Sequence, residues 1–141
     1  MSIHQFPIRV YYEDTDHGGV VYYANYLKFM ERGRTEFLRN HGINLDRVHQ
    51  EQGVMFAVTH VDIHYHTPAI FNDALHVESA LTQCKGARLQ FTQRILRTEA
   101  SQTTLLTQAV VDLACIDDAG KPSRIPSNLL SVLKQYTHKE L

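Results

Sequence analysis

The sequence lacks the features of a secreted or membrane-spanning chain. No apolar run approaches the roughly 20 residues that a bilayer-spanning helix needs. The N-terminus, "MSIHQFPIRVYY", has no positively charged segment followed by an apolar run. We therefore expect a cytoplasmic protein with no secretion signal and no membrane insertion. Cysteine is scarce too: Cys84 and Cys115 lie far apart in strand-like patterns, which favours two reduced thiols over a disulfide or redox pair.

A strong charge of either sign is also missing. The formal net charge is −1 over 141 residues, and no basic arm or block of like charge occurs. Nothing therefore indicates nucleic acid or a membrane surface as a partner. The apolar share of 43% is ordinary for a globular protein. With no repeat, low-complexity tract or linker, the length predicts one domain over residues 1–141.

The first part of the chain predicts a strand followed by a long helix. The segment "IRVYY", residues 8–12, is rich in β-branched and aromatic residues and predicts the first strand. From residue 25 to residue 41 the apolar residues recur at helical spacing. Gly33 in the middle of this helix costs about 1 kcal/mol relative to Ala. That cost indicates close approach by a neighbouring element, for which a sheet is the simplest candidate.

The remainder predicts mostly strands. A short helix over residues 44–53, capped by Asn44, precedes a strand over 54–66 whose apolar phase changes once, as a β-bulge would require. Further strands are predicted over 74–84, 87–97 and 105–117, the last apolar enough to be covered on both faces. Pro126 begins a final helix. The predicted fold class is α+β, with a long central helix wrapped by a curved antiparallel sheet of five or six strands.

Three carboxylates crowd the loop ahead of the long helix, in the segment "YYEDTDHGG": Glu13, Asp14 and Asp16. A helix start offers free N–H groups and a partial positive charge, which stabilise an oxyanion. A carboxylate beside it can attack a carbonyl or deprotonate water. Acids and glycines are equally favoured in ordinary turns before helices. These residues alone therefore leave open whether the loop is catalytic, and which acid would act.

The segment "YYEDTDHGGVVYYANYLKFMERGRTEFL" resembles the hotdog-fold acyl-CoA thioesterases of the 4-hydroxybenzoyl-CoA thioesterase type. It looks most similar to the branch linked to the bacterial Tol–Pal cell-envelope system. The segments "HYHTPAIFNDAL", "KGARLQFTQRI" and "DDAGKPSRIP" also resemble that branch, so the resemblance covers nearly the whole chain. It implies a hotdog domain that hydrolyses an acyl-CoA thioester to a free acid and CoA, with no cofactor.

The resemblance also implies roles for single residues. The family's catalytic carboxylate matches Asp16, which would act as nucleophile or general base. The backbone N–H that polarises the thioester carbonyl matches Tyr23, and an aromatic residue of the Tol–Pal-linked branch matches Tyr12. That branch usually has His where Tyr23 stands, so an imidazole role is lost there while the backbone role remains. His17 replaces the small residue or Pro usual beside the catalytic Asp; it would contact substrate or Asp16, or be an ordinary exposed turn residue.

The residues expected to contact the substrate are Gly19, Val20, Asn25, Lys85, Arg88 and Arg124. Gly19 would let the backbone approach the substrate closely, and Val20 belongs to the family motif. Asn25 would either cap the helix or contact the substrate. The three basic residues are candidates for the CoA phosphates, with plain surface solvation as the alternative.

Alternate residues of the 54–66 strand place His60, Asp62, His64 and His66 on one face, which would allow a metal site. We favour a polar strand face or a subunit contact, and predict no metal.

Partners follow in part from the resemblance. Family members form dimers with sites at the subunit boundary, often paired into tetramers, so we expect a homodimer or homotetramer; an open sheet edge agrees with this. The alternative function is an interaction module for acyl carrier protein or lipid-synthesis enzymes, with incidental hydrolysis. A hotdog hydratase or dehydratase is less compatible with this loop, because Val21 stands where a hydratase-type His is expected.

Overall fold

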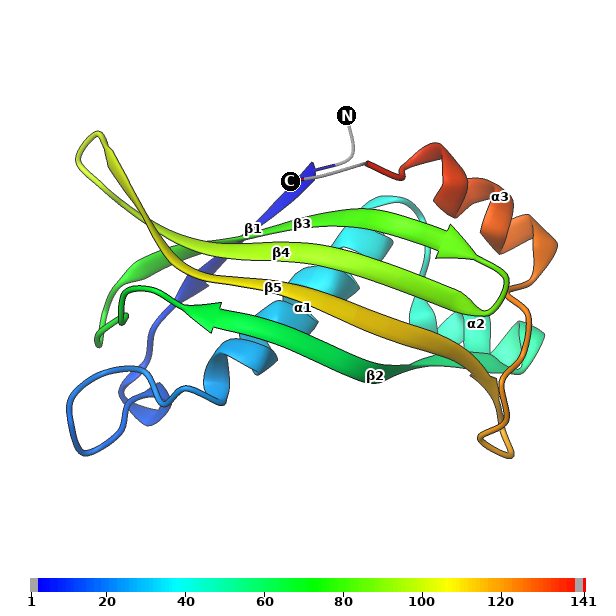
Figure 1. Ribbon diagram of the computed structural model, residues 1–141, viewed down its shortest axis with the longest axis horizontal. Coiled ribbons are helices and arrows are strands. Elements are labelled where there is room, and N and C mark those ends of the chain that lie inside the picture. Colours follow the sequence, from blue (N-terminus) through cyan, green and yellow to red (C-terminus); the bar gives the residue numbers. More distant parts are fainter. Residues whose placement is uncertain (1–2, 139–140) are drawn as a thin grey trace.

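The computed structural model describes residues 3–138 and 141, and it is an antiparallel sheet curved around one long helix (Figure 1). The strands are β1 (Ile3–Arg9), β2 (Val54–Tyr65), β3 (Ala74–Lys85), β4 (Arg88–Glu99) and β5 (Gln102–Asp117). The helices are α1 (Asn25–Asn40), α2 (Leu45–Gln52) and α3 (Ser127–Gln135), with a 3-10 turn over Tyr12–Asp14. The strand order is β1-β3-β4-β5-β2, every neighbouring pair being antiparallel. The predicted fold class is confirmed, with five strands.

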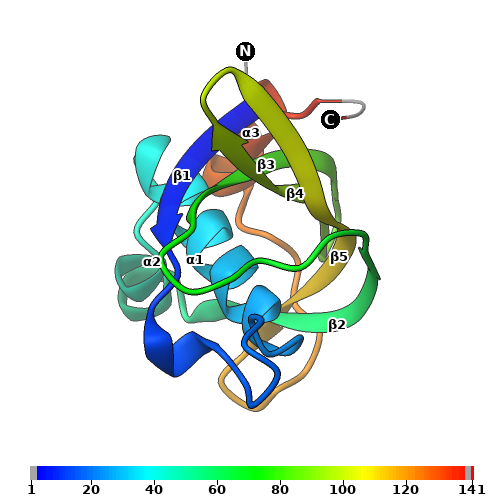
Figure 2. The ribbon, with the colours of Figure 1, turned by 90° about the vertical axis from the view of Figure 1, so that its left-hand side faces the viewer.

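Helix α1 lies in the hollow of the sheet, as the end-on view shows (Figure 2). Its buried face includes Phe29, Met30 and Phe37, which are at most 1% exposed. At Gly33 an added Cβ would lie 2.6 Å from Val77 Cγ1 on β3, far inside van der Waals contact. The close approach that the mid-helix glycine predicted is therefore confirmed, and its partner is β3.

A buried polar network joins α1 to the sheet at the same level, and the sequence did not predict it. The Gln93 side-chain amide donates to the Met30 carbonyl and to Ser79 Oγ, both at 2.8 Å. Its carbonyl oxygen accepts from Arg34 Nη1 at 3.0 Å. Because buried polar groups need partners, the network holds α1 at one rotation against β3 and β4.

The first predicted strand is misplaced. Strand β1 ends at Arg9, and Tyr11 and Tyr12 leave the sheet. The physical reason is local: the Asp14 carboxylate accepts the Tyr11 N–H at 2.8 Å, and a 3-10 turn takes over the backbone hydrogen bonds. The hydrogen bond from Tyr11 to Asp14 thus outweighs the β-propensity of the two tyrosines.

Strand β5 is covered on one face only, so the prediction of two covered faces is wrong. Val111 and Leu113 are buried, but Val110 and Asp112 stay partly exposed. No helix of the described chain lies over the outer face of the sheet (Figure 1). The bulge predicted in β2 is confirmed by a register shift between Val58 and His60.

Smaller predictions hold with adjustments. Asn44 occupies the cap position of α2 but makes no side-chain cap bond. Pro126 is the cap of α3 rather than its first helical residue. Cys84 and Cys115 are buried and unpaired, as expected. Among the described residues, no helix is long and apolar enough to cross a membrane.

Two histidines connect β1, α1 and the end of α3. The His41 ring stacks on Tyr136 with centroids 3.7 Å apart and meets Phe37 edge-on at 4.7 Å. His4 meets Phe37 edge-on at 6.4 Å, and its buried Nδ1 has no partner in the described chain. Burial lowers the pKa of both imidazoles, and the charge of His4 lowers the pKa of His41 further.

We expect the free energy of unfolding to fall as the pH drops below about 6.5, the pKa of an unfolded histidine. Above that pH both states hold neutral rings at His4 and His41 and the stability is complete. Below it the unfolded chain binds protons that the folded chain resists, because the folded pKa values are lowered. Urea unfolding at about pH 7.5 and about pH 5.5 measures the loss. A His41→Phe control keeps a ring there, and an equally large pH loss in that variant would contradict the assignment.

Candidate active site

The acidic loop folds back on itself as a narrow two-armed turn that leads into α1. Thr15 pairs with Val21 in an antiparallel bridge. On either side, the Asp16 N–H donates to the Val20 carbonyl and the Tyr22 N–H donates to the Asp14 carbonyl, both at 2.9 Å. Asp16 therefore lies near the tip of the turn, while Asp14 lies at its base, beside the start of α1.

The three carboxylates have different partners. Asp14 Oδ2 is engaged with the Tyr11 N–H. Asp16 is exposed, and its Oδ1 accepts the Gly18 N–H at 2.9 Å, while Oδ2 makes no hydrogen bond in the described chain. Glu13 is exposed and makes no hydrogen bond or ion pair in the described chain. The Asp14 carboxylate thus holds the turn together, whereas that of Asp16 is fixed by one oxygen and free at the other.

The start of α1 carries an open backbone donor at Tyr23. The Tyr22 N–H donates to Asp14, and the Asn25 N–H donates to the Tyr22 carbonyl at 2.8 Å. Between them, the Tyr23 N–H has no acceptor within the described chain. The Asn25 side chain donates to the Asp14 carbonyl at 2.9 Å, so it ties the helix to the acidic loop. The cap position itself is occupied by Ala24, which makes no side-chain bond.

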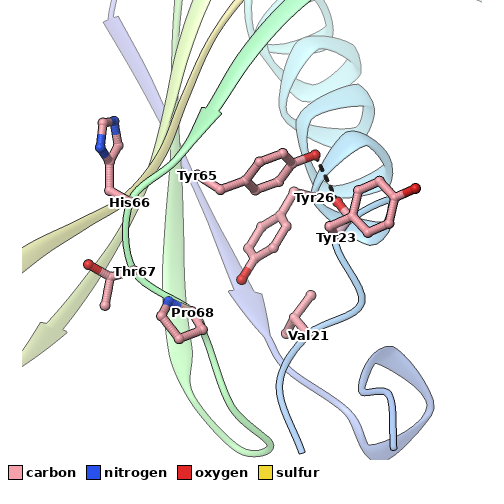
Figure 3. A pocket seen from close by; sticks show the side chains of 7 residues that line it. All are labelled: Val21, Tyr23, Tyr26, Tyr65, His66, Thr67 and Pro68. Carbon is pink, nitrogen blue, oxygen red and sulfur yellow. Dashed lines mark hydrogen bonds between the residues drawn. The ribbon is translucent and has the colours of Figure 1, made fainter. Parts of the chain in front are cut away.

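A cavity of about 200 Å³ opens between the start of α1 and the segment that follows β2 (Figure 3). Its lining residues are Val21, Tyr23, Tyr26, Tyr65, His66, Thr67 and Pro68. The Tyr65 hydroxyl donates to the Tyr23 carbonyl at 3.1 Å. On the other side, the Ala69 N–H donates to the Tyr26 hydroxyl at 3.0 Å. Three tyrosines therefore line a small, mostly apolar space, and one of them, Tyr23, carries the open N–H.

Four more predicted residues lie in or beside this loop. Tyr12 is 79% exposed, and its ring meets Phe71 edge-on at 5.9 Å. His17 is exposed and makes no hydrogen bond or ion pair within the described residues. Val20 pairs with Ile70 in an isolated bridge. Gly19 has φ +84°, a conformation that L side chains rarely adopt, which explains the glycine.

The predicted basic residues lie at or beside the turn between β3 and β4, and this turn is at the opposite end of the sheet from the loop that precedes α1 (Figure 1). Lys85 and Arg88 line a surface cavity of about 240 Å³ at the β3–β4 turn. Arg124 is beside them, because the Ile125 N–H donates to the Gly86 carbonyl at 2.9 Å. The structure thus brings these three residues together with one another, but within one chain it does not bring them to Asp16.

Residues 10–133 match the model of the thioesterase-like superfamily. The chain belongs to this superfamily. It is 41% identical over 135 residues to the acyl-CoA thioester hydrolase YbgC of Escherichia coli O6:H1, covering 95% of this chain and 98% of that one. It is 46% identical over 112 residues to the acyl-CoA thioesterase YbgC of Haemophilus influenzae, covering 79% of each.

Solved structures of thioesterases share the fold. A probable thioesterase from Bartonella henselae superposes with a TM-score of 0.80 at 40% identity, covering 88% of this chain and 99% of that one. A mutant of 4-hydroxybenzoyl CoA thioesterase, complexed with 4-hydroxybenzoyl CoA, superposes with a TM-score of 0.88 over 94% and 99%. At 14% identity the second likeness shows the fold alone.

Among the described residues, the polar face of β2 has no group of three or more His, Cys, Asp or Glu side chains placed to hold a metal ion. His64 Nε2 lies 3.3 Å from Asp62 Oδ1, and both side chains are exposed.

The residues that sequence reasoning missed are Tyr26 and Tyr65. Each is an ordinary aromatic residue of a helix or a strand, so no local signal marks its hydroxyl contact across the cavity.

Proposed function

We propose that the protein hydrolyses an acyl-CoA thioester to a free carboxylic acid and CoA. The observation that carries the proposal is the open N–H of Tyr23, a residue that lines the cavity. The loop that carries Asp16 leads directly into this residue. The named relatives support the acyl-CoA substrate class. The test is release of free thiol from acyl-CoA by the wild-type protein and by an Asp16→Asn variant.

In this mechanism the thioester carbonyl oxygen accepts the Tyr23 N–H. That amide lies at the positive end of α1 and has no competing acceptor in the described chain, so it requires no rearrangement to meet developing negative charge. The side chain at position 23 is not needed for this contact, because any residue except proline supplies the N–H. Tyrosine in place of histidine is therefore compatible with the role.

Asp16 supplies the reacting carboxylate by one of two routes. It attacks the thioester carbon to form a mixed anhydride and release the CoA thiolate, and water then hydrolyses the anhydride. Alternatively it takes a proton from a water that attacks the same carbon, and collapse of the resulting tetrahedral intermediate breaks the carbon–sulfur bond and releases the CoA thiolate. The Gly18 N–H, bound to Oδ1, orients the carboxylate and leaves Oδ2 for either task.

The other residues of the loop assist in different ways. Gly19 and Val20 would line the substrate path by their main chain, and Tyr12 and His17 would contact the substrate from their exposed positions. Asn25 would act indirectly, by holding α1 to the Asp14 carbonyl.

A second copy would complete the site. Strand β2 is an edge of the sheet, so a two-fold partner could pair its own β2 against it. Antiparallel pairing reverses the partner and sets its basic end beside the first copy's Asp16 loop. Lys85, Arg88 and Arg124 would then bind the CoA phosphates from across the boundary of a homodimer or homotetramer.

We expect Arg88→Glu to raise KM for acyl-CoA about ten-fold while lowering kcat less, because a phosphate contact is made equally in the ground and transition states. Steady-state kinetics measure both constants. Arg39→Glu is the matched control, since this exposed arginine lies on α1 and, among the described residues, pairs with Glu36 alone. An unchanged KM in Arg88→Glu would remove this residue from the CoA site.

Binding to an acyl carrier protein or to lipid-synthesis enzymes stays a prediction. One relative, 26% identical over 139 residues, is the acyl-acyl carrier protein thioesterase ATL3 of Arabidopsis thaliana. The carrier-linked acyl group has the same thioester as acyl-CoA, so the site proposed above would serve either carrier.

A further inference from the structure

The end of β2 reaches across the cavity to the start of α1 through Tyr65 (Figure 3). Its hydroxyl lies 3.1 Å from the Tyr23 carbonyl oxygen. Its ring meets Tyr23 edge-on with centroids 6.1 Å apart, and the tilted Tyr26 ring at 5.5 Å. One side chain therefore contacts both the loop residue that carries the open N–H and the first buried ring of α1.

The Tyr23 carbonyl is not used by the helix. The main-chain bonds at the start of α1 run from the Asn25 N–H to the Tyr22 carbonyl at 2.8 Å and from the Leu27 N–H to the Ala24 carbonyl at 3.2 Å, and so pass over the Tyr23 carbonyl. Among the described residues, the donor to the Tyr23 carbonyl is the Tyr65 hydroxyl. Without that hydroxyl, both polar groups of the Tyr23 main chain would lack a protein partner.

Two further bonds interlock the same segments. The Val21 N–H donates to the Ala69 carbonyl at 2.9 Å, and the Ala69 N–H donates to the Tyr26 hydroxyl at 3.0 Å. The segment after β2 is thus tied to the loop on one side and to α1 on the other. Tyr65 adds a bond to Tyr23 itself, which neither of the other two bonds reaches.

We infer that Tyr65 is a positioning residue, whose hydroxyl holds the Tyr23 carbonyl and so orients the Tyr23 N–H toward the thioester oxygen. The inference rests on the proposed function. An oxyanion donor is effective because its direction is set before the reaction, and small misplacements are costly. The bond spans residues that are 42 apart in sequence, so it transmits the position of β2 to the reacting end of the loop.

The Tyr65 hydroxyl is suited to a permanent donor role. Partial burial raises the pKa of this phenol, although the residue is 44% exposed, and the neighbouring Tyr23 and Tyr26 raise it further. The group therefore stays protonated through the pH range in which hydrolysis would be assayed. A tyrosine that had to lose its proton for catalysis would need the opposite shift.

The test compares Tyr65→Phe with Tyr136→Phe in the full-length protein, with acyl-CoA as substrate. Phenylalanine keeps the ring contacts and removes only the hydroxyl. We expect Tyr65→Phe to lower kcat about ten-fold, less than the 10²–10³-fold typical of a lost oxyanion donor, with KM and Tm close to wild type. Tyr136→Phe removes the hydroxyl of a ring that stacks on His41 and does not line the cavity, and it should keep the wild-type kcat.

Three outcomes would overturn the inference. They are an unchanged kcat in Tyr65→Phe, a raised KM with unchanged kcat, or a loss of kcat that merely follows a loss of folded protein by Tm. A Tyr65→Ala variant separates packing from positioning: if activity falls only in that variant, the ring matters and the hydroxyl does not. The proposed function fails separately, through absence of hydrolysis in the wild type or full activity in Asp16→Asn.

Discussion

An Asp16→Asn variant is expected to fold normally and to lose acyl-CoA hydrolysis by about 10²–10⁴-fold. The amide keeps the shape of the side chain and can still accept the Gly18 N–H through its oxygen, so the turn is preserved. It can neither attack a carbonyl efficiently nor take a proton from water. The loss should appear in kcat more than in KM, because the carboxylate acts on the reacting carbon. Thiol release followed with a chromogenic disulfide measures it.

Glu13→Gln is the matched control for this result. It removes a neighbouring negative charge from the same loop, but Glu13 is exposed and makes no hydrogen bond in the described chain. This variant should keep most of its activity. Full activity in Asp16→Asn would contradict the catalytic role of Asp16. An equal loss of activity in both variants would show that Asp16 has no special role among the acids of this loop.

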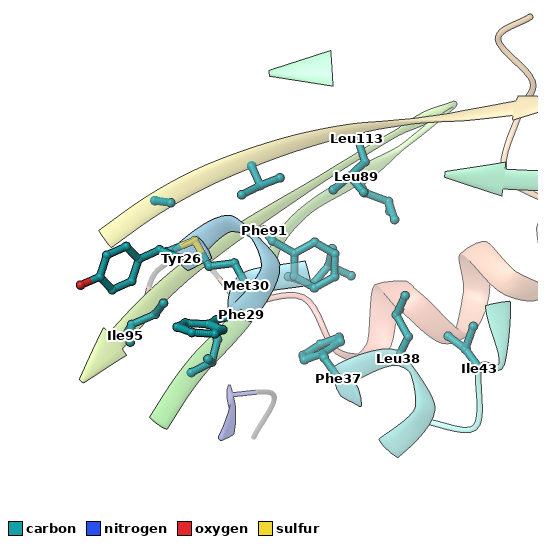
Figure 4. Close-up of a cluster of buried hydrophobic side chains, with 14 of the residues drawn as sticks. Tyr26, Phe29, Met30, Phe37, Leu38, Ile43, Leu89, Phe91, Ile95 and Leu113 are labelled. Atoms are coloured by element: carbon teal, nitrogen blue, oxygen red, sulfur yellow. The ribbon is translucent and has the colours of Figure 1, made fainter. Parts of the chain in front are cut away.

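Replacing Gly33 by alanine is expected to destabilise the protein by about 1–3 kcal/mol, although alanine is the better helix former by about 1 kcal/mol. The new Cβ would lie 2.6 Å from Val77 Cγ1, 3.1 Å from Ser79 Oγ and 3.3 Å from Gln93 Nε2. Val77 is fully buried and β-branched, so it cannot turn away without strain. Packing on both sides of this position is dense, as the neighbouring Met30 and Phe37 illustrate (Figure 4).

Urea unfolding of a two-variant cycle identifies the cause. In a Val77→Ala background the methyl contact is removed, so Gly33→Ala should cost less there than alone, with a coupling of about 0.5–3 kcal/mol. Arg32→Ala, at an exposed position of the same helix, should change stability by no more than about 0.5 kcal/mol. Simple additivity of Gly33→Ala and Val77→Ala would contradict the steric explanation.

Much of the fold could be predicted because the relevant signals are local. The helical period over residues 25–41, the phase change in the following strand and the cost of Gly33 in a helix are properties of short segments. Each found its counterpart in α1, in the β2 bulge and in the contact with Val77. The first strand was misplaced because one nearby side chain, that of Asp14, changes the backbone at Tyr11. The prediction that β5 is covered on both faces failed because a strand's own residues do not specify whether a second layer covers its outer face.

The candidate site was less predictable from the residues themselves. Glu13, Asp14 and Asp16 have the same chemistry, and the resemblance to thioesterases, rather than their spacing, singled out Asp16. The structure adds a physical distinction, since the Asp14 carboxylate is engaged with Tyr11 and that of Asp16 keeps one oxygen free. Lys85 and Arg88 could not be placed relative to Asp16 in advance, because their separation depends on the direction in which the strands run.

The sequence by itself determined the α+β class, the long helix with its close-packed glycine, and the acidic turn ahead of the helix, because hydrophobic period and turn chemistry act over a few residues. Only the tertiary structure decided that the Tyr23 N–H is open, that Tyr65 reaches the Tyr23 carbonyl, and that the basic residues lie at the far end of the sheet. Those features join segments distant in the chain. Strand order and sheet curvature bring such segments together, and no short stretch of sequence specifies either.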